Sequence, residues 1–146
     1  MFISEITNAD AIPSLAKTLR FAGQRQNLIA HNIANISTPD FRPVDVSTDG
    51  FRKVLGDAID RRRARHDGVR GELDWRETRE LRRGRDGEMR LAPQPAGRNI
   101  LFHDKNDRDL ERQIQDLVEN SAVHRMAADL LKSRFDLLRT AISERV

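Results

Sequence analysis

The C-terminal stretch, residues 106–146, constrains the fold of this chain more than any other part. The positions that would face a partner helix, which we call the seam, recur in alternating steps of four and three residues. This period of 3.5 residues is typical of a coiled coil. These positions are Leu110, Ile114, Leu117, Ser121, His124, Ala128, Leu131, Phe135, Leu138 and Ile142. Such a helix would be a rod of about 50 Å that cannot bury its own stripe, so we expect a partner helix in the same chain or in another.

The N-terminal stretch, residues 1–42, carries a second seam with the same period. Its positions are Ile12, Leu15, Leu19, Ala22, Gln26, Ile29, Ile33 and Ile36. We predict a helix that is capped by Asn8 or Asp10, because their side chains can accept a hydrogen bond from the first turn. The helix should end near Ile36, since Pro39 pushes the preceding residue out of the helical conformation.

Two seams at opposite ends of one chain predict that the terminal helices pack against each other. The predicted fold class is mainly α, with long N- and C-terminal helices forming a coiled-coil hairpin and an irregular middle segment. Each seam is polar at its centre, at Gln26 in the first and at Ser121 and His124 in the second. Ordering the helices offsets much of the gain from burial, so we expect the hairpin to be marginal alone and firm among further helices. Gly23 either allows close helix approach or is simply tolerated.

The middle segment, residues 43–105, shows no sustained period. The apolar positions that fit a short amphipathic helix are Phe51, Val54, Leu55 and Ile59. Residues 61–90 are dense in Arg, Asp, Glu and Gly, residues 91–98 favour a linker, and residues 99–102 favour a short strand or an apolar hook. We predict that this segment is a loop that can contain a hairpin or a short helix. We expect the segment to be partly disordered in isolation.

Composition excludes several classes of protein. There is no cysteine, so disulfides, thiol catalysis and cysteine-ligated zinc are excluded. No apolar run approaches the ~18 residues that span a bilayer, and no basic region precedes an apolar core, so we expect neither direct membrane insertion nor a cleaved signal peptide. The net charge is only +3, and acids are interleaved with the arginines, which favours a self-pairing solvated segment over a nucleic-acid surface.

Candidate catalytic and metal-binding patterns are weak. The chain has 4 histidines, and none stands in a metal-ligand pattern. Residues 103–109 resemble the start of a calcium loop, but Arg108 stands where a third oxygen ligand belongs. A helix start capped by Asn106 or Asp107 explains them better. We therefore predict no enzyme, no cofactor and no metal.

Two stretches resemble a known family. Residues 30–42, AHNIANISTPDFR, are similar to the N-terminal signature of the flagellar axial rod, hook and hook-filament junction proteins, usually ANNIANxxTPGYK. The end helix, with DLE at 109–111 and LVEN at 117–120, resembles the C-terminal helix of the short proximal rod members. Asp40 stands where Gly is common, and Asp tolerates a left-handed turn better than most residues. Lys105–Asp109 replaces the usual GNNVD, and both matches together cover about half of the chain.

The resemblance implies a structural subunit of the bacterial flagellar basal body, in the proximal rod within the periplasmic space. The implied partners are other rod subunits, the rod–MS-ring adaptor, the MS ring and the flagellar type III export apparatus, with no nucleic acid. The assembly residues that we predict are Leu15, Leu19, Ile29, Ile33, Ile36, Leu110, Ile114, Leu117, Leu131, Phe135 and Leu138. The family-motif residues are Asn32, Ala34, Asn35, Thr38 and Pro39. The rivals are the other short proximal rod protein, a cytoplasmic coiled-coil adaptor and a basic nucleic-acid binder.

Overall fold

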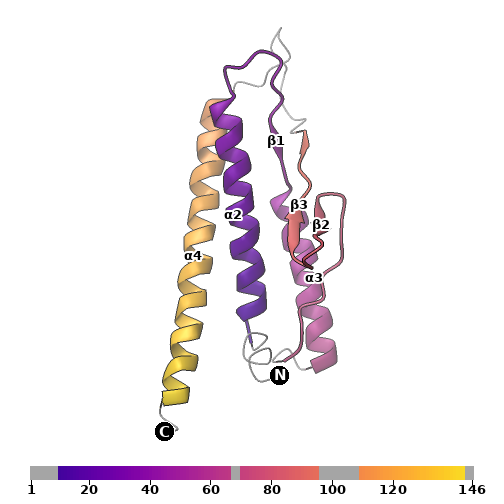
Figure 1. Cartoon of the computed structure of the whole chain (residues 1–146), viewed down its shortest axis with the longest axis vertical. Helices are drawn as coiled ribbons and strands as arrows, with labels where there is room; N and C mark the ends of the chain where they lie inside the picture. Colours follow the sequence, from indigo (N-terminus) through magenta and orange to yellow (C-terminus); the bar gives the residue numbers. More distant parts are fainter. Residues whose placement is uncertain (1–9, 67–69, 96–108, 144–146) are drawn as a thin grey trace.

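The computed structural model describes residues 10–66, 70–95 and 109–143 and is mainly helical (Figure 1). Its elements are α2 (Ile12–Ala34), β1 (Val44–Asp45), α3 (Thr48–His66), β2 (Leu81–Arg83), β3 (Met89–Leu91), β4 (Gln94–Pro95) and α4 (Leu110–Ser143). The long C-terminal helix and the few short strands confirm the predicted mainly α class. Among the described helices, none combines the length and apolar character needed to cross a membrane.

Helix α2 lies at the centre of the molecule (Figure 1). Helix α4 runs antiparallel along one side of α2, and α3 with the strands lies on the other side. The strands form two small antiparallel ladders, in which β1 pairs with β4 and β2 pairs with β3. Helix α2 is therefore in contact with both α4 and the middle segment.

The start of α2 differs from the prediction. Ala11, and not Asp10, occupies the N-cap position, and no side chain caps the first turn. Instead, the hydroxyl of Ser14 donates to the carbonyl of Ala11 at 2.7 Å. Pro13 fits here because the first turn of a helix leaves its N–H groups without helical partners. The other predicted cap, Asn8, lies outside the described residues.

The end of α2 is set by the turn that follows it. The helix ends at Ala34, two residues before Ile36, and Asn35 is its C-cap. The Nδ2 of Asn35 donates to the carbonyl of His31 at 2.9 Å, which satisfies a carbonyl in the last turn. In the turn beyond, Asp40 has a φ of 61°, in the left-handed region that Asp tolerates better than most residues. The backbone conformation explains why Gly also suits this position.

The hydrophobic core lies between α2 and the middle segment. The rings of Phe21 on α2 and Phe51 on α3 are stacked, with centroids 4.0 Å apart. The other buried members of this core are Val46, Ala58, Leu73, Trp75, Leu81 and Met89. Most of these side chains come from the segment that the sequence analysis assigned largely to loop.

The middle segment is more regular than predicted. The predicted amphipathic helix is confirmed as α3, but it continues to His66 instead of ending near Ile59. The β2–β3 hairpin pairs Leu81 with Leu91 and places one buried side chain on each strand, at Leu81 and Met89. A strand of three residues is too short to show an alternating pattern in the sequence, which explains why no period was detected.

The region before α4 was predicted as a linker, then a strand or hook, then a helix start. Part of the linker, residues 91–98, is strand, because β4 begins at Gln94. Residues 99–102 and the predicted caps Asn106 and Asp107 lie outside the described residues. Asp109 caps α4, because its Oδ1 accepts the N–H of Arg112 at 3.1 Å.

We expect Phe51→Ala to lower the free energy of unfolding by about 3–4 kcal/mol, because it removes a fully packed ring from the core. Phe135→Ala is the matched control, since Phe51 is 6% exposed and Phe135 is 43% exposed. The control should cost less than about 1 kcal/mol. Urea unfolding measures both values, and equal losses would contradict the position of the core.

Candidate functional site

The interface between α2 and α4 is polar at its centre. The Nδ2 of Asn120, which is 5% exposed, donates to the carbonyl of Ala22 at 2.8 Å and to Oε1 of Gln26 at 2.7 Å. The Nε2 of Gln26 donates to the hydroxyl of Ser121 at 3.0 Å. Gln26 and Ser121, two of the polar positions at the centres of the predicted seams, therefore bond to each other across the interface.

Gly23 on α2 faces His124 on α4 at this interface. A Cβ at position 23 would lie 3.7 Å from the Nε2 of His124, which is an ordinary van der Waals distance. The two helices therefore do not need a glycine here to approach each other. Of the two alternatives for Gly23, the structure favours simple tolerance.

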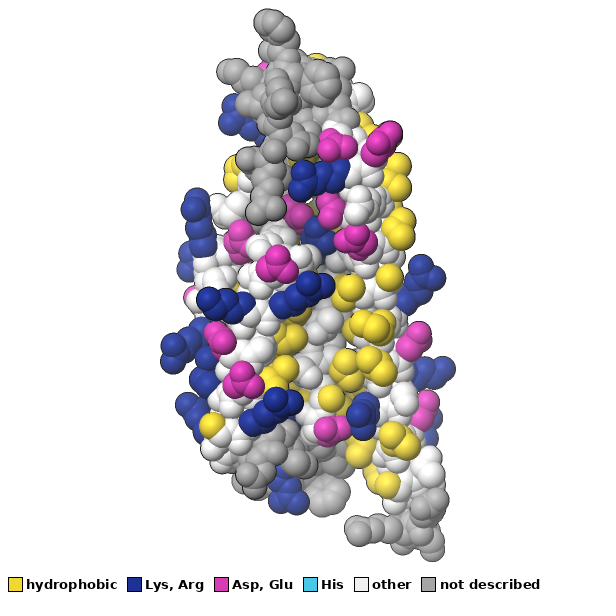
Figure 2. Space-filling view, turned by 180° about the vertical axis from the view of Figure 1, so that it is seen from behind, with side chains coloured by type: hydrophobic (Ala, Val, Ile, Leu, Met, Phe, Trp, Pro, Cys, Tyr) yellow, Lys and Arg dark blue, Asp and Glu magenta, His cyan; other side chains and the backbone are white. Residues whose placement is uncertain are grey.

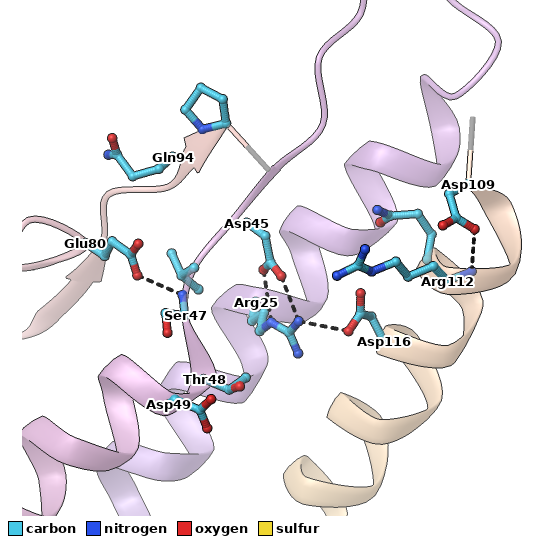
Figure 3. A pocket seen from close by; sticks show the side chains of 13 residues that line it. Arg25, Asp45, Ser47, Thr48, Asp49, Glu80, Gln94, Asp109, Arg112 and Asp116 are labelled. Carbon is cyan, nitrogen blue, oxygen red and sulfur yellow. Dashed lines mark hydrogen bonds and ion pairs between the residues drawn. The ribbon is translucent and has the colours of Figure 1, made fainter. Parts of the chain in front are cut away.

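A buried arginine joins α2, β1 and α4 (Figure 3). Arg25 donates to both carboxylate oxygens of Asp45, at 3.0 and 2.7 Å, and to Asp116 on α4 at 3.2 Å. Burial lowers the pKa of this guanidinium, but its hydrogen bonds and charge pairing with the two carboxylates raise the pKa above its ordinary value. Because one charge is shared by three elements, this cluster fixes how they sit relative to one another.

A pocket of about 310 Å³ opens beside Arg25 and is rich in acids. Asp45 and Asp116 already bond to Arg25, and Glu80 accepts the backbone N–H of Ser47 at 2.7 Å. These carboxylates are thus used within the fold. In the described part of the chain, no group of three or more His, Cys, Asp or Glu side chains is placed to hold a metal ion.

Two amide side chains of α2 bond to the short strands. Asn32 donates to the carbonyl of Val44 at 2.8 Å and accepts its N–H at 3.1 Å. Gln24 donates to the carbonyl of Met89 at 2.8 Å and accepts the N–H of Leu91 at 3.0 Å. Each amide pairs with the backbone as a neighbouring strand would, so strands of two and three residues gain a partner.

The family-motif residues lie at the C-terminal end of α2 and in the turn that follows it. Asn32 is buried and holds β1, and Asn35 caps the helix. Ala34 is the last helical residue, and Thr38 and Pro39 lie exposed in the turn. The motif thus combines one residue that positions the returning strand with others that end the helix and direct the chain away from it.

The predicted assembly residues divide into three groups by burial. Ile29 is fully buried, with 1% of its surface exposed. Those that are partly buried are Leu15, Leu19, Ile33, Ile36, Leu117, Leu131 and Leu138. The exposed ones are Leu110, Ile114 and Phe135.

Helix α4 also carries an exposed apolar stripe, which we call the outer stripe. Its large members are 43–62% exposed and comprise Leu110, Ile114, Val118, Met126, Leu130 and Leu137. Figure 2 shows hydrophobic side chains gathered along the α4 side of the molecule, while Lys and Arg lie mainly along the opposite edge. An exposed apolar stripe of this length is typical of a surface that another molecule covers.

Most of the outer stripe was not predicted from the sequence, because Val118, Met126, Leu130 and Leu137 fall outside the 3.5-residue seam. The available signal was a recurrence of apolar residues every four positions from Leu110, which runs beside the seam and was masked by it.

Comparison with models of known protein families and with curated protein sequences finds no match to this chain.

We expect Asn32→Ala to lower the free energy of unfolding by about 1–3 kcal/mol, because the N–H and the carbonyl of Val44 lose their amide partner. Asn27→Ala is the matched control, since Asn27 is an exposed asparagine on the same helix. The control should change stability by less than about 0.5 kcal/mol. Urea unfolding of both variants is the measurement, and an Asn32 variant as stable as the control would refute this role.

Proposed function

We propose that this chain is a structural subunit that assembles through its terminal helices into the proximal rod of the bacterial flagellar basal body, where it transmits motor torque. The observation that carries the proposal is the outer stripe of α4, which remains exposed while the opposite face of the helix packs on α2. In the assembled state, α2 and α4 act as a coiled-coil hairpin whose free face is covered by neighbouring subunits.

The energetics support an assembly role for α4. Burying a large apolar side chain contributes about 1.5–3 kcal/mol, and the outer stripe offers several such side chains on one helix. The contacts of α4 with α2 are largely polar at their centre, and the large side chains of the outer stripe are still 43–62% exposed. A neighbouring helix that covers the stripe supplies this gain.

The resemblance at the two ends supports the assignment to the rod. Its pattern is closest to the basal-body rod protein FlgB, and the other short proximal rod protein, FlgC, is the alternative. In this proposal the partners are other rod subunits, the rod–MS-ring adaptor, the MS ring and the type III export apparatus, which exports the chain without a cleaved signal peptide.

A cytoplasmic coiled-coil adaptor is the second candidate, because the outer stripe would also suit a closed dimer. The two candidates differ in the species that they form. An adaptor forms a defined dimer in light scattering of the purified chain, whereas a rod subunit appears in isolated basal bodies.

We expect Leu130→Asp to abolish swimming and rod assembly while the free chain keeps its helix content, because Leu130 is exposed on the outer stripe. Leu131 is a poorer probe, since it is partly buried and a charge there would also disturb the free chain. The measurements are swimming in soft agar, electron microscopy of basal bodies and circular dichroism.

Leu130→Met is the matched control and should leave swimming intact, because it keeps the apolar surface. Deletion of the gene should leave basal-body rings without a rod. Normal swimming of the Leu130→Asp strain would contradict assembly through the outer stripe, and complete rods in the deletion strain would contradict the rod assignment.

A further inference from the structure

A groove of about 530 Å³ lies between α3 and the loop that precedes β2, away from the outer stripe. Lys53, Asp57 and Arg61 form its α3 wall at four-residue spacing, and Arg76 and Arg79 stand on its loop wall. Glu77 and Glu80 also line the loop wall, so the groove has four basic and three acidic side chains and a small excess of positive charge.

The acidic side chains on the loop wall of the groove already have hydrogen-bond partners, whereas most of its basic side chains have none among the described residues. Glu77 and Glu80 each accept a backbone N–H, at 2.8 and 2.7 Å. By contrast, Lys53, Arg76 and Arg79 have no hydrogen-bond or ion-pair partner within residues 10–66, 70–95 and 109–143. Lys53, Arg76 and Arg79 are therefore available to pair with acidic side chains of another molecule.

Arg61 stands at the C-terminal end of the α3 wall. Its Nη2 donates to the carbonyl of Asp74 at 2.8 Å, which fixes the position of the side chain. Its Nε is buried and has no acceptor among the described residues. This atom is enclosed by the fold, so Arg61 contributes its positive charge to the groove and not a free Nε donor.

The first turns of α4 present a row of complementary character. Glu111, Gln115 and Glu119 are exposed and recur every four residues, and Gln115 donates to Glu119 at 2.9 Å. Glu111 and Glu119 lie about 12 Å apart along the helix, which is also the rise between Lys53 and Arg61 on α3. The apolar residues beside this row belong to the outer stripe and are Leu110, Ile114 and Val118.

We propose that this acidic row of α4 from one copy docks into the α3 groove of a second copy, an inference that rests on the assembly function proposed above. Glu111 and Glu119 meet the basic side chains, and Gln115 faces Asp57. Side-chain rows with four-residue spacing interdigitate in the commonest class of helix packing. Because the two surfaces are different patches, the contact is heterologous and extends into an open array.

The test uses the absence of native cysteine. One copy carries Asp57→Cys, and a second, tagged copy carries Gln115→Cys; both positions are exposed on helices. The two copies are expressed together, treated with a mild oxidant, and analysed in isolated basal bodies. We expect the disulfide-linked heterodimer to exceed either homodimer. Arg52→Cys replaces Asp57→Cys in the control, since Arg52 is exposed on α3 outside the groove, and this pair should give no excess.

The outcomes separate the inference from the function on which it rests. Basal bodies that contain the chain but lack the heterodimer overturn the inference and leave the rod assignment in place. A cross-link from position 57 to another basal-body protein, without the heterodimer, also overturns it. Basal bodies that lack the chain altogether overturn the rod assignment and the inference together.

A charge exchange tests whether opposite charges hold the α4 row in the α3 groove. Lys53→Glu with Arg79→Glu in the groove copy, or Glu111→Lys with Glu119→Lys in the α4 copy, should each lower the heterodimer yield about tenfold. The two changed copies together should restore the yield, because opposite charges face each other again. Unchanged yield with either set alone, or no recovery with both, would overturn the proposed pairing.

Discussion

The structure depends on polar side chains of α2 that bond to backbone edges and to partly buried carboxylates around the helix. Strands of two or three residues cannot satisfy their own hydrogen-bonding groups. Asn32 and Gln24 supply the missing partners for β1 and β3, and Arg25 bonds to Asp45 on β1 and to Asp116 on α4. Because these bonds have fixed directions, they determine where each element lies, while the core beside them supplies most of the apolar burial.

Helix α2 therefore has two faces with different roles. Toward the middle segment it contributes Phe21 to the core, where burial gives stability without strict directionality. Toward α4 it offers Gln26 and the carbonyl of Ala22 to Asn120, which specify the register of the two helices but add little net free energy. The position of α4 is well specified, and much of its apolar surface remains available.

The terminal helices could be predicted from the sequence because their period extends over many residues. The class of the fold and the amphipathic helix around Phe51 followed from the same reasoning. The core was not predictable, because Leu73, Trp75, Leu81 and Met89 come from short segments that leave no recurrence. The position of Asn32 near the end of α2 indicates that its amide can bond to the chain as it leaves the helix, but the particular partner, Val44 twelve residues away, leaves no signal in the sequence. Most of the outer stripe was missed because a stronger pattern shares the helix with it.

The four-residue recurrence of the outer stripe has a geometric consequence. On a straight helix, each such step rotates by about 40°, so the stripe turns gradually from one flank of α4 to the other between Leu110 and Leu130. A straight rod laid parallel to α4 could shield only a fraction of this winding surface. Complete shielding of this surface requires contacts that reach α4 from several directions at successive heights along the helix.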